Sequence, residues 1–239
     1  MNNKLYLPLL AAILVLAGCK SDKIDPEPMV NGSDYYPIAV GDYKVYEVLE
    51  IAQLGDTSNL NSYSSDTTYY QYRETVDSAF VDESNEEIFR IFRYRRQTSS
   101  DTWLEDSVMV VKKTDYRVER TANNTKEVKL VFPMKQGKSW DSNNFNSKPV
   151  RTMTYRQLDV PYTFTRSAGD TAFANTVLVV APTDSLIRVI RYNERYARGA
   201  GLIETRHYII DYDDQQIGSG IIEQARYRLV KLLQYGKEE

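Results

Sequence analysis

Cysteine and histidine each occur once in this 239-residue sequence. One cysteine cannot form a disulfide within the chain or supply the clustered thiolates of zinc and iron–sulfur sites. One histidine cannot build a multi-histidine metal site. Thirty basic and 33 acidic residues give a formal charge of −3, which offers no general attraction to nucleic acid. We therefore expect no nucleic-acid partner and no thiolate or multi-histidine metal centre.

Long apolar runs are also missing. The first run extends from Leu5 to Ala17, is broken only by Pro8, and is shorter than the roughly 20 residues that span a bilayer as a helix. Its length is typical of the core of a signal peptide. The run ends in Leu16-Ala17-Gly18-Cys19, which resembles the lipobox of bacterial lipoproteins.

The lipobox resemblance implies cleavage before Cys19, so that residues 1–18 are a lipoprotein signal peptide. It also implies a diacylglyceryl group on the Cys19 thiol and an acyl chain such as palmitate on the freed amine. Two or more acyl chains anchor a protein stably to a membrane without a spanning helix. The alternative is an ordinary secretory peptide followed by a free cysteine.

Residues 19–34 are polar and rich in turn formers, which indicates a flexible tether after the lipidated cysteine. Lys20 stands where retained inner-membrane lipoproteins of enterobacteria typically carry Asp, so the resemblance points to the outer membrane. The mixed charge that follows resembles the surface-export signals of Bacteroidota lipoproteins. Whether the protein faces the periplasm or the cell surface stays open.

After the tether, period-two alternation in short runs of β-branched and aromatic residues dominates the sequence. In one run, Tyr70, Tyr72, Glu74 and Val76 share a face. The final run also fits a helix, but its aromatic and β-branched residues favour a strand. The predicted strands cover residues 42–54, 67–81, 87–97, 103–113, 116–121, 127–132, 150–157, 176–180, 186–196, 202–212 and 221–235.

These strands, with no helices alternating between them, indicate a mainly β protein. We predict a single antiparallel sheet that curls into a barrel or half-barrel and so buries its edges, with a sandwich as the alternative. No repeat or composition break divides residues 35–239, which are predicted to form one β-rich domain. The Asn-rich stretch near 141–149 is predicted to be a loop.

Two short stretches resemble segments of uncharacterised Bacteroidota outer-membrane lipoproteins. Residues 36–46, Tyr-Pro-Ile-Ala-Val-Gly-Asp-Tyr-Lys-Val-Tyr, resemble Phe-Pro-Leu-x-x-Gly-x-x-Trp-x-Tyr without its tryptophan. Residues 194–203, Glu-Arg-Tyr-Ala-Arg-Gly-Ala-Gly-Leu-Ile, resemble Glu-x-Tyr-Ala-x-Gly-Val-Gly-Leu-Val. The resemblance implies an anchored protein with one β domain and brings no catalytic residues. Gly199 and Gly201 fit a tight turn or bulge, because glycine tolerates positive φ.

The sequence offers little for catalysis. His207 lies in a predicted strand, and no Gly-x-Ser-x-Gly elbow is present to hold a nucleophilic serine. Adjacent acids such as Asp213 and Asp214 point to opposite faces of a strand, so adjacency alone makes no glycosidase site. The stretch 211–218 lacks the glycine and closing glutamate of an EF-hand, and no phosphate-binding loop occurs. We predict a protein that is not an enzyme and has no metal or cofactor.

Arginine and tyrosine are frequent. On neighbouring strands, Arg188, Arg191, Arg195 and Arg198 would form a face that clamps phosphate or carboxylate groups of a lipid or glycan. The alternative is a solvated sheet face that pairs with the abundant acids. The 19 tyrosines suit contacts with sugars or proteins, although tyrosine is also a good strand former.

Asp-(Ser/Thr) followed by an apolar residue or Thr occurs more often than the composition predicts. This triplet matches the O-glycosylation pattern of exported Bacteroidota proteins, and a glycan would add a bulky, solubilising surface group. The alternative is that Asp-Ser/Thr simply suits the turn that precedes a strand. The candidate acceptors are Thr67, Ser78, Ser107, Thr171 and Ser185.

Together these features predict a non-enzymatic lipoprotein of the bacterial outer membrane, anchored through Cys19. Its β domain is predicted to bind a lipid or other amphipathic ligand in a cavity of the curved sheet. The alternative is a structural or accessory subunit that binds a protein or glycan partner through a Tyr/Arg-rich face. A strand-lined cavity would favour the first function, and a packed interior with an exposed aromatic patch the second.

Overall fold

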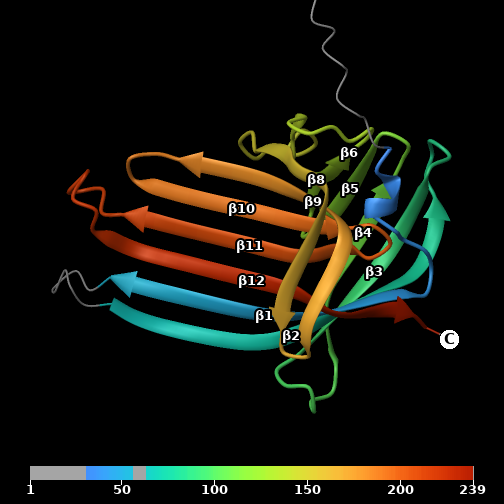
Figure 1. Ribbon diagram of the computed structural model, residues 1–239, viewed down its shortest axis with the longest axis horizontal. Coiled ribbons are helices and arrows are strands. Elements are labelled where there is room, and N and C mark those ends of the chain that lie inside the picture. The colour runs from blue at the N-terminus through green and yellow to red at the C-terminus, as the bar shows by residue number, and fades with distance from the viewer. Residues whose placement is uncertain (1–30, 56–62, 239) are drawn as a thin grey trace, which may run out of the picture.

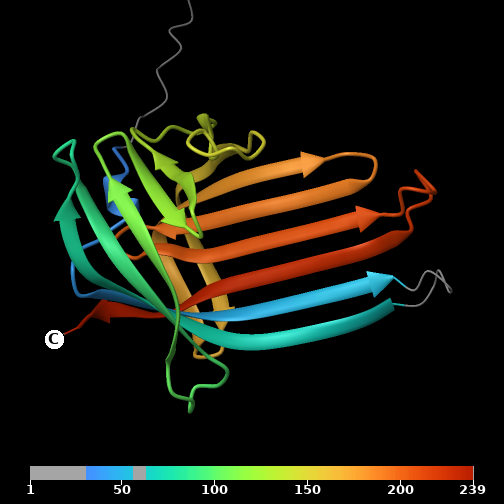
Figure 2. The same ribbon diagram turned by 180° about the vertical axis from the view of Figure 1, so that it is seen from behind.

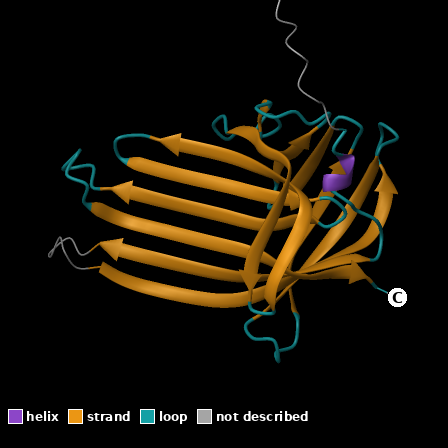
Figure 3. Cartoon of the chain, in the orientation of Figure 1, coloured by secondary structure: helices purple, strands orange, loops and turns teal. Residues whose placement is uncertain are grey.

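The computed structural model describes residues 31–55 and 63–238, which form strands almost throughout (Figure 3). The predicted signal peptide and Cys19 lie outside the described residues. A short 3₁₀ helix, η2 (Ser33–Tyr35), precedes the strands. They are β1 (Asp42–Gly55), β2 (Tyr63–Val81), β3 (Glu87–Arg96), β4 (Leu104–Lys113), β5 (Arg117–Ala122), β6 (Thr125–Val131), β7 (Ser139–Asp141), β8 (Thr152–Arg166), β9 (Gly169–Asp184), β10 (Arg188–Ala197), β11 (Gly201–Tyr212) and β12 (Ile222–Lys237).

All twelve strands belong to one antiparallel sheet, in the order β6-β5-β4-β3-β2-β1-β12-β11-β10-β9-β8-β7. Strands that follow each other in the chain are neighbours, except β6 and β7, and the chain-terminal strands β1 and β12 pair in the middle of the sheet. The sheet curls into a nearly closed barrel (Figures 1 and 2). The predicted mainly β, barrel-like fold is therefore confirmed, and the final run is a strand. No helix within 31–55 and 63–238 has the length and hydropathy to cross a bilayer.

The two outermost strands, β6 and β7, meet along a seam that few backbone bonds cross. The amide of Val128 donates to the carbonyl of Ser142 over 2.9 Å. The indole of Trp140 donates to the Val128 carbonyl over 3.0 Å. The hydroxyl of Tyr155 accepts from the Val131 amide and donates to the Val131 carbonyl, both over 2.8 Å. Side chains thus satisfy edge groups of β6 that a thirteenth strand would otherwise pair with.

The barrel core follows the predicted alternation. Val230 and Leu232 of β12 point inward beside Val48 and Tyr46 of β1, their register partners, and all four are buried. The face predicted for β2 is also confirmed, since Tyr70, Tyr72 and Val76 are buried. Apolar burial of this kind stabilises the fold by about 25 cal/mol per Å². The largest fully buried side chains are Tyr35, Tyr46, Tyr155, Tyr196, Leu130, Met134, Met153, Ile203 and Leu232.

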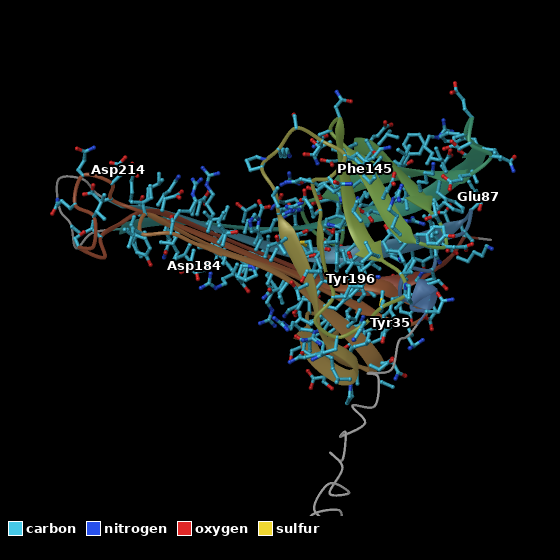
Figure 4. The ribbon with its side chains drawn as sticks, turned by 90° about the horizontal axis from the view of Figure 1, so that it is seen from above. Tyr35, Glu87, Phe145, Asp184, Tyr196 and Asp214 are labelled. Atoms are coloured by element: carbon cyan, nitrogen blue, oxygen red, sulfur yellow. The ribbon has the colours of Figure 1, made fainter. Side chains whose placement is uncertain are left out.

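Beyond the barrel, five long strands and the end of β9 continue as a projecting layer (Figure 1). We call this layer the wing and define it as residues 50–55, 63–69, 182–184, 188–192, 207–212 and 222–228. Seen along the sheet, it is a thin layer with side chains on both sides and with Asp184 and Asp214 toward its far end (Figure 4). Its inner face is the one that continues the barrel interior, and its outer face is the opposite one.

The hairpin of β8 and β9 is longer than the sequence predicted. The strands predicted at 150–157 and 176–180 omit residues 158–175, and β7 was not predicted at all. Gln157 and Asp159 have positive φ, and the register of β8 with β9 shifts between Arg156 and Val160. The bent hairpin lies over the outer face of the sheet, where the Ser167 amide donates to the Glu47 carboxylate over 3.0 Å.

The two stretches that carry the family resemblance meet in space. The hydroxyl of Tyr46 donates to the carbonyl of Leu202 over 3.2 Å, and the rings of Tyr36 and Tyr196 lie 6.3 Å apart. Gly199 and Gly201 both have positive φ, as predicted for a turn. A Cβ on Gly201 would lie 2.5 Å from the Nζ atom of Lys44, the movable end of a flexible side chain, so it is the positive φ that favours glycine at this position.

Candidate functional site

The inner face carries a groove where the wing meets the barrel. The groove consists of two recesses of about 300 and 390 Å³, and both are lined by His207 and Arg228. One recess is bounded by strands from around the barrel, and the other lies over β1, β2, β11 and β12 of the wing. We call the combined feature the groove. Together the volumes fall within the range of small-ligand sites, about 300–1,000 Å³.

The groove is richer in cations than the chain as a whole. Six cationic side chains line it against four acidic ones, whereas the complete sequence has 30 against 33. Strand alternation explains part of the set, because Arg226 and Arg228 share the inward face of β12 with Val230 and Leu232. The cations are Arg93, Arg120, Lys129, Lys148, Arg226 and Arg228, and the acids are Glu50, Asp66, Glu127 and Glu194.

Tyrosine rings hold guanidinium groups beside the groove. The guanidinium carbon of Arg95 lies 3.9 Å from the ring centre of Tyr70, and that of Arg93 lies 4.4 Å from the ring centre of Tyr72. Such stacking restricts the long side chains and leaves their N–H edges available for hydrogen bonds. These arginines of β3 thus rest on tyrosine rings of β2 that are themselves buried.

A buried carboxylate fixes two of these arginines. Glu74 Oε1 accepts hydrogen bonds from Arg93 over 2.5 Å and from Arg120 over 2.7 Å. Burial alone would raise the pKa of Glu74, but the charges of Arg120 and Arg93 outweigh it and lower the pKa to about 2. Glu74 is therefore ionised at neutral pH and holds both guanidinium groups in place.

A second buried ion pair lies at the floor of the groove. Lys129 donates to Glu194, whose other carboxylate oxygen accepts from the Tyr196 hydroxyl over 2.7 Å. Burial would raise the pKa of Glu194, but the charge of Lys129 and three hydrogen bonds hold it below its ordinary value. Because its main charge partner is inside the barrel, Lys129 supports the groove without offering a free charge.

His207, the single histidine, lies between the two recesses. Its ring makes an edge contact with Tyr192 at 5.3 Å between ring centres. Burial, followed by the charges of Arg151 and Arg228, lowers the pKa of His207 below its ordinary value. The histidine is therefore neutral at pH 7, and the positive charge of the groove comes from arginine and lysine.

The four arginines predicted to form an anion-binding face do not come together. Arg188 lies on the inner face of β10 and pairs with Asp211, whereas Arg191 lies on the outer face and pairs with Asp184. Arg195 donates to the hydroxyl of Thr176 and to Gln157, and Arg198 pairs with Asp159 and Asp34. Strand alternation separates Arg188 from Arg191, which stand three positions apart, and Arg198 lies beyond the end of β10.

The groove arginines were only partly visible in the sequence. Arg93 and Arg95 stand in a stretch with four arginines, residues 90–96, but neither they nor Arg120, Arg226 and Arg228 were predicted as site residues. The sequence does contain a signal for them. Each lies an even number of positions from core residues of its own strand, and therefore on the buried face, as Glu74 does in β2. A charged residue in phase with a buried face indicates a polar interior.

The candidate O-glycosylation residues lie on four separate parts of the sheet. Thr67 and Ser78 lie in β2, Ser107 in β4 and Thr171 in β9. Ser185 is exposed in the β9–β10 turn, where its hydroxyl accepts from the Arg188 amide over 3.0 Å. Glycosylation of these residues stays a prediction.

The acidic side chains of residues 211–218 form hydrogen bonds and ion pairs with nearby residues. Asp213 accepts from the Gln215 amide over 2.8 Å, and Asp211 pairs with Arg188. Among residues 31–55 and 63–238, no three His, Cys, Asp or Glu side chains come close enough to hold a metal ion.

A recess with largely apolar walls lies on the outer face, beside the tip of the β8–β9 hairpin. Its volume is about 450 Å³, and its walls include Leu49, Tyr69 and Leu229. Polar side chains, among them Arg166 and Lys231, stand at its rim. We call this feature the outer recess. It does not lie inside the curved sheet, where the cavity for an amphipathic ligand was predicted.

Two solved structures of low sequence identity are similar to this chain. No protein-family model and no curated protein matches the chain. One similar solved structure is a protein with a YmcC-like fold from Bacteroides fragilis, at 11% identity and a TM-score of 0.39, over 84% of this chain and 98% of that one. Another is described as a lipoprotein from Parabacteroides distasonis, at 12% identity and a TM-score of 0.40, over 83% and 98%. Similarity at this level does not extend to activity.

Proposed function

We propose that this chain is a non-enzymatic lipoprotein of the bacterial outer membrane whose groove binds a ligand carrying phosphate or carboxylate groups. The membrane anchor rests on the lipidation predicted at Cys19. The ligand class rests on one observation, the gathering of arginine and lysine around a concave groove in a chain of net charge −3. Guanidinium groups hold such oxyanions through paired, charge-assisted hydrogen bonds.

Three cationic side chains in and beside the groove are not neutralised by an acidic side chain among the described residues. Within the part of the chain that the structure describes, Arg95, Lys148 and Arg226 form no ion pair. Arg95 stacks on Tyr70, and Arg226 lies 3.5 Å from a side-chain oxygen of Gln224. A ligand anion would therefore gain attraction from these groups without displacing an internal carboxylate.

The neighbouring arginines offer hydrogen bonds. The Nε–H groups of Arg93 and Arg151 are buried and have no hydrogen-bond partner among the described residues. Arg151 stacks over Tyr192, a wall of the groove, at 5.2 Å from the ring centre. A buried donor without an acceptor costs about 1–3 kcal/mol, and a ligand oxygen would remove that cost.

The proposal is tested by isothermal titration of the full chain with Cys19→Ser, which blocks lipidation. The probes are tripolyphosphate, hexagalacturonate and, as a neutral control, maltohexaose. We expect one or both anions to bind with an affinity that falls as salt is added, and maltohexaose not to bind. The stronger anion then distinguishes a phosphate-bearing from a carboxylate-bearing ligand.

A pair of variants locates the binding. Arg226→Gln with Arg228→Gln removes two groove charges and is expected to weaken the anion at least tenfold. Arg191→Gln is the matched control, because Arg191 lies on the outer face of the same wing and pairs with Asp184. Absence of binding, or equal binding by all variants, contradicts the proposal.

A second candidate is the predicted amphipathic ligand, which the outer recess favours. Leu49, Tyr69 and Leu229 offer an apolar wall there, with Lys231 and Arg166 at the rim for a polar head. Displacement of a fluorescent fatty acid measures this binding, and Leu229→Gln is expected to weaken it. An unchanged signal in Leu229→Gln would exclude the outer recess as the lipid site.

A further inference from the structure

One stretch of the sheet has a free edge without the usual protection. β2 pairs with β1 from Tyr63 onward, but its pairing with β3 begins only at Gln71. Residues 63–70 therefore lack a strand partner on one side, and they form the lower border of the wing in Figure 1. An unpaired edge presents N–H and C=O groups that another strand can pair with.

Other unpaired stretches carry features that discourage such pairing. The open side of β4 over 104–109 contains Glu105 and Asp106, and the open sides of β8 and β9 contain Pro161 and Pro182. Charges and prolines are how natural edge strands avoid adding a partner. The edge of β2 has neither proline nor lysine, and Asp66 is its one charged residue.

The composition of this edge favours strand pairing. Its residues are Tyr-Ser-Ser-Asp-Thr-Thr-Tyr-Tyr, in which Thr and Tyr are good strand formers. The exposed ring of Tyr69 stands on the outer face. The Tyr69 carbonyl already accepts from the Gln97 side chain over 2.5 Å, so an incoming strand shares or displaces this one bond. Asp66 forms no ion pair within the part of the chain that the structure describes.

We propose that this edge pairs antiparallel with the same edge of a second copy, about a twofold axis at Thr67. In this register Thr67 faces itself, Asp66 faces Thr68 of the second copy, and Tyr69 faces Ser65. The one charge thus meets a hydroxyl, and the large ring meets a small side chain. A register centred on Asp66 instead would set two carboxylates against each other and would be destabilised.

The self-complementarity of the edge is the reason to assign it to a second copy rather than to a foreign strand. The twofold axis is perpendicular to the sheet. The inner faces of both copies therefore lie on the same side of the joined sheet, with their grooves next to each other. Seven residues, 64–70, form the contact in each copy, and an interface of this size is at the small end of specific contacts. The dimer is accordingly weak and depends on concentration.

Sedimentation analysis of the full chain with Cys19→Ser, over a wide range of concentrations, tests the proposal. We expect a reversible monomer–dimer equilibrium. Hydrogen exchange supplies a second measurement, because the amides of residues 64–70 that point to the free edge become protected only as the dimer forms. A monomer at every concentration contradicts the proposal, as does protection of these amides only when a foreign peptide is added.

Two lysine variants test the register. Thr67→Lys sets two ammonium groups opposite each other at the axis and is expected to weaken the dimer by about two- to fivefold. Thr68→Lys places an ammonium opposite Asp66 twice and is expected to strengthen it by up to about 20-fold. Thr183→Lys, on the proline-bearing edge of the wing, is the control and leaves the equilibrium unchanged. A dimer that responds equally to all three variants lies elsewhere and contradicts the assignment.

Discussion

The same strands build two regions of different character. In β1, Tyr46 and Val48 are buried inside the barrel, whereas Ala52 and Leu54, a few residues further in the same phase, are exposed in the wing. The alternation does not change between the two halves. What changes is the opposite wall: in the barrel, strands β3 to β7 stand across from the inner face, whereas in the wing none of the described residues covers it. Stability therefore resides in the barrel, and accessible surface in the wing.

The largest expected effect comes from the charged interior of the barrel. Lys129→Met leaves the buried carboxylate of Glu194 without its charge partner and is expected to lower the free energy of unfolding by about 3–5 kcal/mol. Urea denaturation at pH 7 measures the change. The double variant Lys129→Met with Glu194→Leu should recover most of it, and a single-variant loss below about 1 kcal/mol would show that the pair is solvated.

Leucine truncation compares the regions directly. Leu232→Ala empties a fully buried site in the barrel and is expected to cost about 2–5 kcal/mol of unfolding free energy. Leu54→Ala makes the same chemical change in the wing, where the side chain is 57% exposed, and should stay within about 0.5 kcal/mol. Denaturant midpoints of the two variants provide the test. Equal losses would mean that the wing is covered in solution.

Acid should unfold the barrel through Glu74. Its folded pKa of about 2 lies below the ordinary 4.5, so its contribution is fully present above pH 4.5 and is lost as the pH falls toward 2. The loss is on the order of 3 kcal/mol. In urea denaturation between pH 6 and pH 2.5, the free energy of unfolding should fall less steeply with decreasing pH in Glu74→Gln than in the unchanged protein. Asp77→Asn, whose pair with Arg90 is screened by solvent, should alter this slope much less.

The seam between β6 and β7 gives the smallest expected effect. Tyr155→Phe removes the hydroxyl that serves both the amide and the carbonyl of Val131, at a cost of about 1–3 kcal/mol. Hydrogen exchange at the Val131 amide should accelerate at the same time. Tyr208→Phe in the wing is the control, with a change below about 0.5 kcal/mol. An unchanged Val131 amide in Tyr155→Phe would mean that backbone contacts alone hold the seam.

Much of the barrel could be predicted because period-two alternation identifies a strand and its buried face. The match of Tyr70, Tyr72 and Val76 to the core follows from this rule alone. The same rule excludes a common face for Arg188 and Arg191, which stand three positions apart. The odd spacing of Arg188 and Arg191 within one strand was sufficient to exclude a common face. Their closeness in the sequence nevertheless suggested one.

The remaining features depend on contacts between distant residues. Alternation continues unchanged from residue 48 to residue 54, so no local signal tells where the barrel ends and the wing begins. The bend of β8 uses positive φ at Gln157 and Asp159, which are not glycines and carry no strong turn signature. The groove needs β2, β3, β5 and β12 together, and that assembly is set by the curl of the sheet rather than by any one segment.

The pairing of β1 with β12 has a consequence for how the chain acquires its fold. Some 180 residues separate partners such as Val48 and Val230, so the middle of the sheet cannot form until the last strand has been synthesised. Contacts this distant in sequence slow folding, because the entropy of closing a large loop precedes any gain. A circular permutant that joins the natural ends and opens the chain between β6 and β7 would make every strand neighbour sequential. It should reach the same structure faster.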